Sequence, residues 1–209
     1  TLPVQAAVSE TDILFFLKRN QKKITCVNIS RHLAKYVEEC SDELLRRLPC
    51  AFRINCVLYK DYPTRKVLEF VKRFSSFPTS IQFRSDYTMT TPENLYEEDQ
   101  IFHNLKELFR YIGLEGCRMR NGYHFSYLGF PITYHKTLPY STIVETDTSG
   151  TTYEILYDVV IKQNGEIHSD WTGVPLNISA YRNVRFEPYD LQSLPLENVG
   201  LSLNKLKGT

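Results

Sequence analysis

The sequence has none of the short motifs that identify a catalytic or cofactor site. It contains no G-x-G-x-x-G, no Walker-type loop and no G-x-S-x-G, and its nine glycines are scattered. No apolar run approaches the roughly 18 residues that a membrane-spanning helix needs, and the stretch at 13–17 lacks a signal-peptide cleavage pattern. These absences favour a protein that is not an enzyme, has no cofactor and has no membrane partner.

The five cysteines are odd in number and include no Cys-x-x-Cys pair. Secreted domains of this size usually pair their cysteines, whereas intracellular proteins keep them reduced. We therefore expect buried thiols, no metal site and an intracellular protein, nuclear or cytoplasmic. A zinc site would have to be assembled from scattered residues; its candidate ligands are Cys26, Cys40, Cys50 and Cys56.

Charge is divided unevenly along the 209 residues, although the net charge is only +1. Residues 1–84 carry 15 Lys+Arg against 8 Asp+Glu, whereas residues 85–209 carry 10 against 16. Such asymmetry indicates either an acidic or phosphate-bearing partner for one half, or two halves that attract each other. We predict a basic helix-rich part at 1–84, a linker-like segment at 85–99 and an acidic part at 100–209.

The basic part reads as helices interleaved with short strands. Ser9 and Asp12 form a capping box before an apolar stripe, and Ser41 is placed to cap a short helix that Pro49 stops. The alternating residues 51–59 indicate a half-buried strand in which Arg53 and Asn55 face outwards. We expect helices at 10–20, 41–48 and 64–74 and a further strand at 22–27. A second helix is expected after Asn28 or Ser30 as its cap, with Ile29, Leu33, Tyr36 and Val37 at helical spacing. Over residues 9–60 this order resembles a winged helix, an interpretation that competes with helices that merely support a sheet.

The acidic part changes to a period of two after one helix, expected near 96–112 and stopped by Gly113. Asn121-Gly122 lies between two short alternating runs, 118–120 and 123–125, that are expected to be strands, and it is a strong signal for a hairpin turn. Further strands are expected near 130–137, 141–148, 151–162 and 166–171, followed by an irregular C-terminal tail. The fold class is therefore α+β, with an antiparallel β-meander following the helix-rich part.

Basic residues recur on several elements of the first half and again beside the Asn121-Gly122 pair. Cations in such positions contact phosphates in nucleic-acid-binding proteins, although a solvated helix end explains the run 18–23 equally simply. The candidate nucleic-acid contacts are Lys18, Arg19, Lys22, Lys23, Arg31, Lys35, Arg46, Arg47, Arg118 and Arg120.

The run 118–127 interleaves cations with aromatic residues, which in sheet-type RNA binders stack bases. By alternation, however, Tyr123, Phe125 and Tyr127 share one face, as core residues do. Arg118, Arg120 and His124 then share the other face. A core face backed by a solvated face is the favoured interpretation.

Three histidines sit in patterns that invite a catalytic hypothesis. His124 and His135 each begin a His-x-Ser/Thr tripeptide, similar to the tripeptides of two-histidine phosphoesterases, but only 11 residues separate them. His168 and a carboxylate two residues away, Glu166 or Asp170, could share a metal, but no third ligand occurs at a recognisable spacing. A small hydrolase is therefore the third hypothesis for function.

The favoured hypothesis is a non-enzymatic protein-interaction subunit or adaptor of an intracellular multiprotein complex. It uses exposed aromatic residues and the two oppositely charged parts to bind proteins. The alternative is a nucleic-acid-binding protein that contacts DNA or RNA through its basic half. The sequence names no partner.

Overall fold

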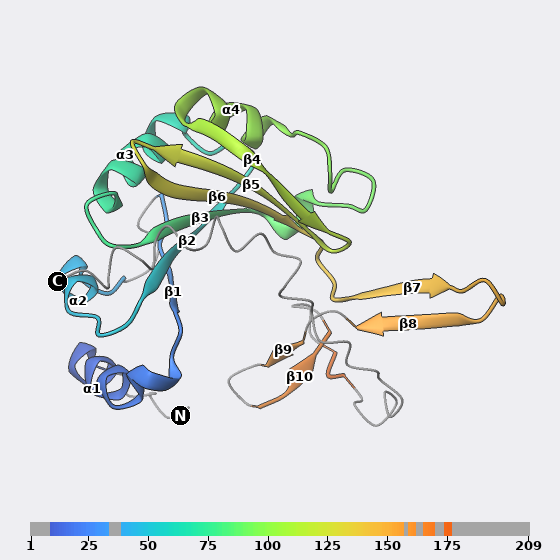
Figure 1. The fold of residues 1–209 in the computed structure, drawn as a ribbon, viewed down its shortest axis with the longest axis horizontal. Helices are drawn as coiled ribbons and strands as arrows, with labels where there is room; N and C mark the ends of the chain where they lie inside the picture. Colours follow the sequence, from blue (N-terminus) through green and yellow to red (C-terminus); the bar gives the residue numbers. More distant parts are fainter. Residues whose placement is uncertain (1–8, 34–38, 157–158, 162–164, 170–173, 177–209) are drawn as a thin grey trace, which may run out of the picture.

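A six-stranded mixed sheet organises the molecule, with its strands in the order β1-β2-β3-β6-β5-β4 (Figure 1). The computed structural model describes residues 9–33, 39–156, 159–161, 165–169 and 174–176. The pairs β1–β2, β2–β3 and β3–β6 are parallel, whereas the pairs β6–β5 and β5–β4 are antiparallel. The strands are β1 (Val27–Ser30), β2 (Phe52–Leu58), β3 (Ser80–Ser85), β4 (Arg110–Cys117), β5 (Arg120–Tyr127) and β6 (Phe130–Thr137).

Two helices, α3 (Thr64–Phe74) and α4 (Gln100–Leu108), lie on the same side of this sheet (Figure 1). In α3 the buried residues recur at helical spacing, so that one stripe faces the sheet. The Asp99 side chain caps α4 by accepting a hydrogen bond from the Phe102 amide at 2.8 Å. The remaining helices are α1 (Glu10–Asn20), α2 (Asp42–Arg46) and the short 3₁₀ turns η1 (Gln21–Lys23) and η2 (Tyr87–Met89).

The main core lies between the sheet and the two helices, and it is rich in aromatic rings. Phe83 on β3, Tyr134 on β6 and Phe125 on β5 each project from the sheet into it and are almost fully buried. Phe74 and Phe102 enter from α3 and α4, so both helices share one apolar cluster with the sheet. Strands from both sides of residue 85 therefore belong to one sheet and one core.

Two small antiparallel pairs stand outside the main sheet. The hairpin of β7 (Thr142–Thr146) and β8 (Thr152–Leu156) projects away from the sheet, and β9 (Val160–Ile161) pairs with β10 (Ile167–His168) (Figure 1). Among the described residues no helix is long and apolar enough to cross a membrane.

The structure is consistent with an α+β fold, but the prediction of a helix-rich N-terminal part is wrong. Residues 27–85 supply three parallel strands joined by crossovers, with α3 between β2 and β3. A winged helix instead places its strands in an antiparallel ribbon, so that resemblance is wrong as well. The predicted strand at 22–27 is wrong, since Gln21–Lys23 form η1 and β1 begins only at Val27. The predicted second helix is wrong at its start, because Ile29 lies in β1, and its residues 34–38 lie outside the described residues.

The antiparallel meander is also wrong in its topology. Only β4, β5 and β6 follow one another as a meander, and β6 then pairs in parallel with β3. The helix predicted to run to Ile112 ends at Leu108, because Phe109 adopts an extended conformation and β4 begins at Arg110. Asn121-Gly122 lies within β5, and the chain instead turns at 118–119, between Cys117 and Arg120.

Several local predictions are confirmed. The Ser9–Asp12 capping box begins α1, and the Ser41 hydroxyl caps α2 by accepting from the Leu44 amide at 3.1 Å. Residues 52–58 and 64–74 form a strand and a helix with the expected buried sides. Local patterns therefore predicted elements correctly where one amphipathic face was buried against the core.

Candidate functional site

The side of the sheet opposite α3 and α4, here called the polar face, collects polar side chains from four strands. Strand pairing aligns Asn55, Gln82, Thr133 and His124 in one row across β2, β3, β6 and β5. The next row contains Val57, Arg84, His135, Gly122 and Glu115. Because alternate residues of the same strands fill the apolar core, this polar set is a consequence of the alternation that builds the sheet.

His135 lies near the centre of the polar face and is held by its neighbours. Its Nδ1 atom is 2.7 Å from the Gln82 amide nitrogen. An amide nitrogen only donates, so Nδ1 accepts and the neutral ring carries its proton on Nε2. A Cβ on Gly122 would lie 3.0 Å from that Nε2 atom, so the imidazole rests against backbone that only glycine provides.

The protonation of His135 is strongly disfavoured by its surroundings. Burial is the largest cause, and nearby positive charges add to it, lowering the pKa of His135 to about 3. The contributing charges come from β2, β3 and β5: Arg120, Arg84, His124 and Arg53. His135 is therefore neutral at physiological pH in a positive local field, and at that pH such a low pKa makes it a poor general base.

This arrangement predicts a specific loss of stability in acid. The folded protein keeps His135 neutral down to about pH 3, whereas the unfolded chain protonates it near the ordinary pKa of 6.5. Between these values the unfolded state binds more protons, so the free energy of unfolding falls as the pH falls, by up to about 1.4 kcal/mol per pH unit. Urea unfolding across this range should show a shallower pH dependence for His135→Gln. Exposed His103→Gln is the control, and identical slopes in the two variants would contradict the assignment.

His124 lies on the same face as His135 but has a different partner. Its Nε2 atom is 3.2 Å from Glu115 Oε2 on β4, and its side chain is 37% exposed. The two histidines sit on adjacent strands one row apart, which the sequence spacing alone did not reveal. No cluster of three metal-ligating side chains occurs among the described residues.

The first four predicted basic contacts lie at the end of α1 and in the turn that follows. Lys18, Arg19, Lys22 and Lys23 are all exposed. They accompany two adjacent phenylalanines, Phe15 and Phe16, whose residues are 69% and 61% exposed. Leu17 is the one buried residue of this helix. The exposed end of α1 is thus both aromatic and positively charged.

Arg31 is used within the fold, in contrast to the exposed cations of α1. Its guanidinium is buried, donates to the Cys40 carbonyl at 2.8 Å and lies 3.6 Å from a Glu39 carboxylate oxygen. Arg73 binds both carboxylate oxygens of Asp42 and thereby holds the pKa of that carboxyl below its usual range. Together these contacts connect the end of β1 to α2 and α3.

The other predicted contacts are dispersed over the molecule. Arg47 is exposed at the end of α2, Arg118 pairs with Glu145 on β7, and Arg120 is exposed on the polar face. Lys35 lies outside the described residues. Tyr123 and Phe125 are buried in the core, as the favoured interpretation of their alternation predicted.

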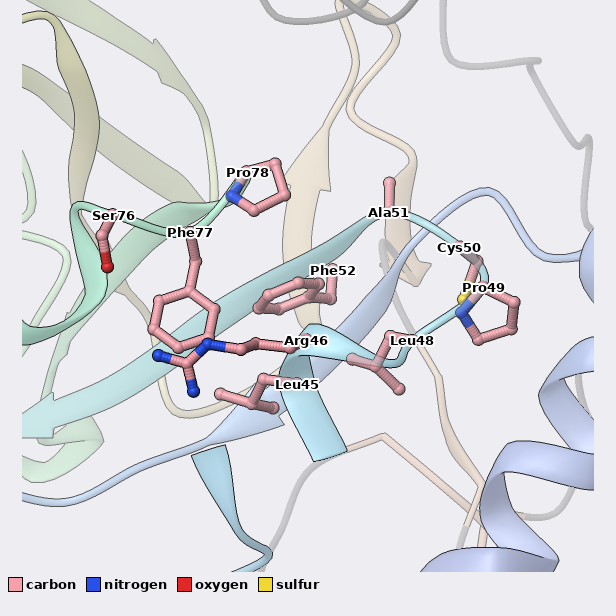
Figure 2. A pocket seen from close by; sticks show the side chains of 10 residues that line it. All are labelled: Leu45, Arg46, Leu48, Pro49, Cys50, Ala51, Phe52, Ser76, Phe77 and Pro78. Carbon is pink, nitrogen blue, oxygen red and sulfur yellow. The ribbon is translucent and has the colours of Figure 1, made fainter. Parts of the chain in front are cut away.

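Arg46 covers an apolar hollow of about 510 Å³ between α2, the start of β2 and the turn after α3 (Figure 2). Its guanidinium lies over the Phe77 ring, 4.7 Å from the ring centre. Cys50 lines the hollow, and burial raises the pKa of its thiol. No carboxylate or histidine is among the lining residues: Leu45, Arg46, Leu48, Pro49, Cys50, Ala51, Phe52, Ser76, Phe77 and Pro78.

His168 does not join the other histidines in one row. It lies on β10, in a separate two-stranded sheet, with its Nε2 atom 3.3 Å from Glu166 Oε2. Asp170, which the sequence pattern placed beside it, lies outside the described residues.

Comparison with known proteins gives no match to a family model, a curated protein or a solved structure.

Sequence reasoning missed the centre of the polar face. Arg53 and Asn55 were expected to face outwards from their strand, and His124 was placed on a solvated side. Gln82 and Arg84 carried no such signal, because residues 80–85 were not recognised as a strand. Only the pairing of β3 with both β2 and β6 brings these residues beside His135.

Proposed function

We propose that the protein is a non-enzymatic protein-interaction subunit or adaptor of an intracellular multiprotein complex, nuclear or cytoplasmic, and that α1 contacts its partner. The observation that carries this proposal is the exposure of Phe15 and Phe16 side by side on one helix. Large aromatic side chains are enriched in protein interfaces, where they fill pockets and dominate the binding energy. Two such rings in water are costly unless a partner covers them.

The charge next to these rings indicates the chemistry of the partner. Lys18 and Arg19 follow the phenylalanines directly, and Lys22 and Lys23 follow in η1. A matching surface would offer an apolar pocket for the rings and a rim of carboxylates for the cations. Attraction between this carboxylate rim and the cations of α1 would raise the association rate, and high salt would screen it. The contact of the aromatic rings with their pocket would persist at high salt.

A protein partner suits this surface better than the nucleic-acid alternative does. Arg31, one of the predicted phosphate contacts, is engaged inside the fold, and Arg118 is paired with Glu145. The aromatic rings of β5 that might have stacked bases, Tyr123 and Phe125, are in the core. At the end of α1, by contrast, the exposed cations lie next to the exposed Phe15 and Phe16 side chains, so this surface combines positive charge with apolar area.

Partner recovery from the native source at high salt tests this function. With nuclease present, the wild-type protein should retain a stoichiometric protein partner, and Phe15→Ser combined with Phe16→Ser should reduce its recovery by about thirtyfold. Val144→Ser, which changes an equally exposed apolar residue on β7, is the matched control and should retain the partner.

Either of two results would overturn the proposal. One is retention of the partner by the double variant at the wild-type level. The other is loss of all bound material on nuclease treatment, which would favour the nucleic-acid alternative.

A further inference from the structure

We propose that the polar face around His135 binds a phosphate group. This inference is independent of the proposed function, because it concerns the sheet and not α1. It rests on positive charge gathered from separate strands, on a fixed neutral donor at its centre and on a buried hydroxyl that has no partner.

Among the described strand positions of the polar face, arginines outnumber carboxylates. Arg84 stands beside His135 in the same row of strand positions, and Arg120 follows in the next row on β5. Glu115 is the one carboxylate in these rows, and it is occupied by His124 at the edge of the sheet. Arginine forks match the oxygens of a phosphate better than any other side chain does.

His135 adds a neutral donor in a fixed orientation. The bond from Gln82 to Nδ1 leaves Nε2–H as the donating edge, and the close approach of Gly122 keeps the ring in place. A donor that is held before the ligand arrives loses little conformational freedom on binding. The arginines near His135 create a positive local field that disfavours protonation of its ring. A bound anion would weaken that field.

One buried hydroxyl on this face, Thr137 Oγ1, lacks a hydrogen-bond partner. Thr137 is paired with Arg120 across β5 and β6, so its hydroxyl lies beside the exposed arginine. A hydroxyl donates as well as accepts, and buried polar groups are normally satisfied. A phosphate oxygen between Arg120 and Thr137 would supply the acceptor that the hydroxyl lacks.

The same chemistry serves a free phosphate compound and the backbone of a nucleic acid. The rows of the polar face described here contain no phenylalanine, tyrosine or tryptophan, so they offer no ring on which a base would stack. Recognition is therefore of the phosphate group itself, and the two sources are separated by the probe.

Calorimetric titration with inorganic pyrophosphate and, separately, with a short oligouridylate tests the site. Arg120→Gln should weaken binding about tenfold or more, because it removes a charged hydrogen-bond donor. Arg65→Gln removes an equal charge from α3, on the opposite side of the sheet and with a side chain that is 90% exposed, and should change binding less than twofold. Binding of pyrophosphate identifies a small phosphate ligand, and binding of the oligonucleotide alone identifies a nucleic-acid backbone.

Nuclear magnetic resonance of the histidine side chains gives a second, independent measurement. Saturating probe should raise the pKa of His135, since a bound anion favours the charged ring, whereas the side-chain resonances of exposed His103 should not move. Gly122→Ala displaces the imidazole and should weaken binding while circular dichroism shows an unchanged fold. The proposal is overturned if neither probe binds, or if Arg65→Gln weakens binding as much as Arg120→Gln does.

Discussion

Replacing Phe102 by alanine is expected to lower the free energy of unfolding by about 3–5 kcal/mol, the range for a large aromatic removed from a core. Phe102 is fully buried on α4, and its ring centre lies 4.7 Å from that of Tyr123 and 5.3 Å from that of Tyr111. Its loss would empty the junction between α4 and the antiparallel strands β4 and β5. Because several aromatic rings surround it, the gap cannot be closed by one rotamer change.

Comparing the free energies of unfolding of Phe102→Ala and Phe16→Ala in urea separates the effect of core packing from the effect of removing any aromatic ring. Phe16 is mostly exposed, so its truncation should change the free energy of unfolding by about 0.5 kcal/mol or less. Equal effects of the two substitutions would mean that α4 is not packed on the sheet in the way described here. A reduced slope against urea in Phe102→Ala alone would indicate that α4 has separated from the sheet.

How much of this molecule could be predicted from the sequence depended on where the determining contacts lie. The strand 52–58 and the helix 64–74 were predicted correctly, because each buries one face against a shared core and its residues repeat with the matching period. Pairing between strands that are distant along the chain produces no such periodicity in the sequence. The residue pattern of 80–85 does not indicate that β3 lies between β2 and β6.

Asn121-Gly122 shows how distant contacts override a strong local preference. The pair favours a turn in isolation, yet the Asn121 amide donates to the Leu95 carbonyl, and Gly122 lies under the His135 ring. Both residues are therefore used as strand residues by partners that the local sequence does not contain. The actual turn, at 118–119, was read as part of a strand because Arg118 and Met119 lack turn chemistry.

The fold also changes the interpretation of the uneven charge along the chain, because the ion pairs that the structure shows among its described residues do not join the two parts. Within the described residues, close ion pairs such as Arg73–Asp42 and Arg118–Glu145 join residues on the same side of residue 85. The two parts are joined instead by the hydrogen bonds of β3 with β6 and by a common apolar core. Arginines of both parts then meet on the polar face, which charge counts along the chain could not show.

Lys136 holds the segment before α4 to the sheet, and replacing it by methionine tests that role. Its side chain is 2% exposed, and its ammonium donates to the carbonyl oxygens of Asn94 at 2.5 Å and Glu97 at 2.9 Å. Asp99 Oδ2 lies 3.6 Å away and also accepts from the Tyr134 hydroxyl at 2.7 Å. One buried charge thus fixes a loop and the residue that caps α4.

Lys136→Met is expected to lower the free energy of unfolding by about 3 kcal/mol. Methionine fills similar volume, so the loss comes from carbonyl groups and a carboxylate left without their donor and not from a cavity. Because Asp99 is 26% exposed and water relieves part of its charge, the cost falls at the lower end of the range for a broken buried pair. Lys66→Met, at an exposed position on α3, is the control and should cost about 0.5 kcal/mol or less.

Hydrogen exchange shows where the stability is lost. Amides of residues 94–102 should exchange faster in Lys136→Met, since these residues lose the carbonyl contacts and the fixed position of Asp99, while those of β2 and β3 follow the global change. Uniform acceleration throughout the sheet would contradict a local anchoring role. Unchanged stability would show that the ammonium gains no more from these carbonyl groups than it loses in desolvation, and the segment would then be held by Leu95, which is buried, and by the Tyr123 hydroxyl, which donates to the Glu97 carbonyl.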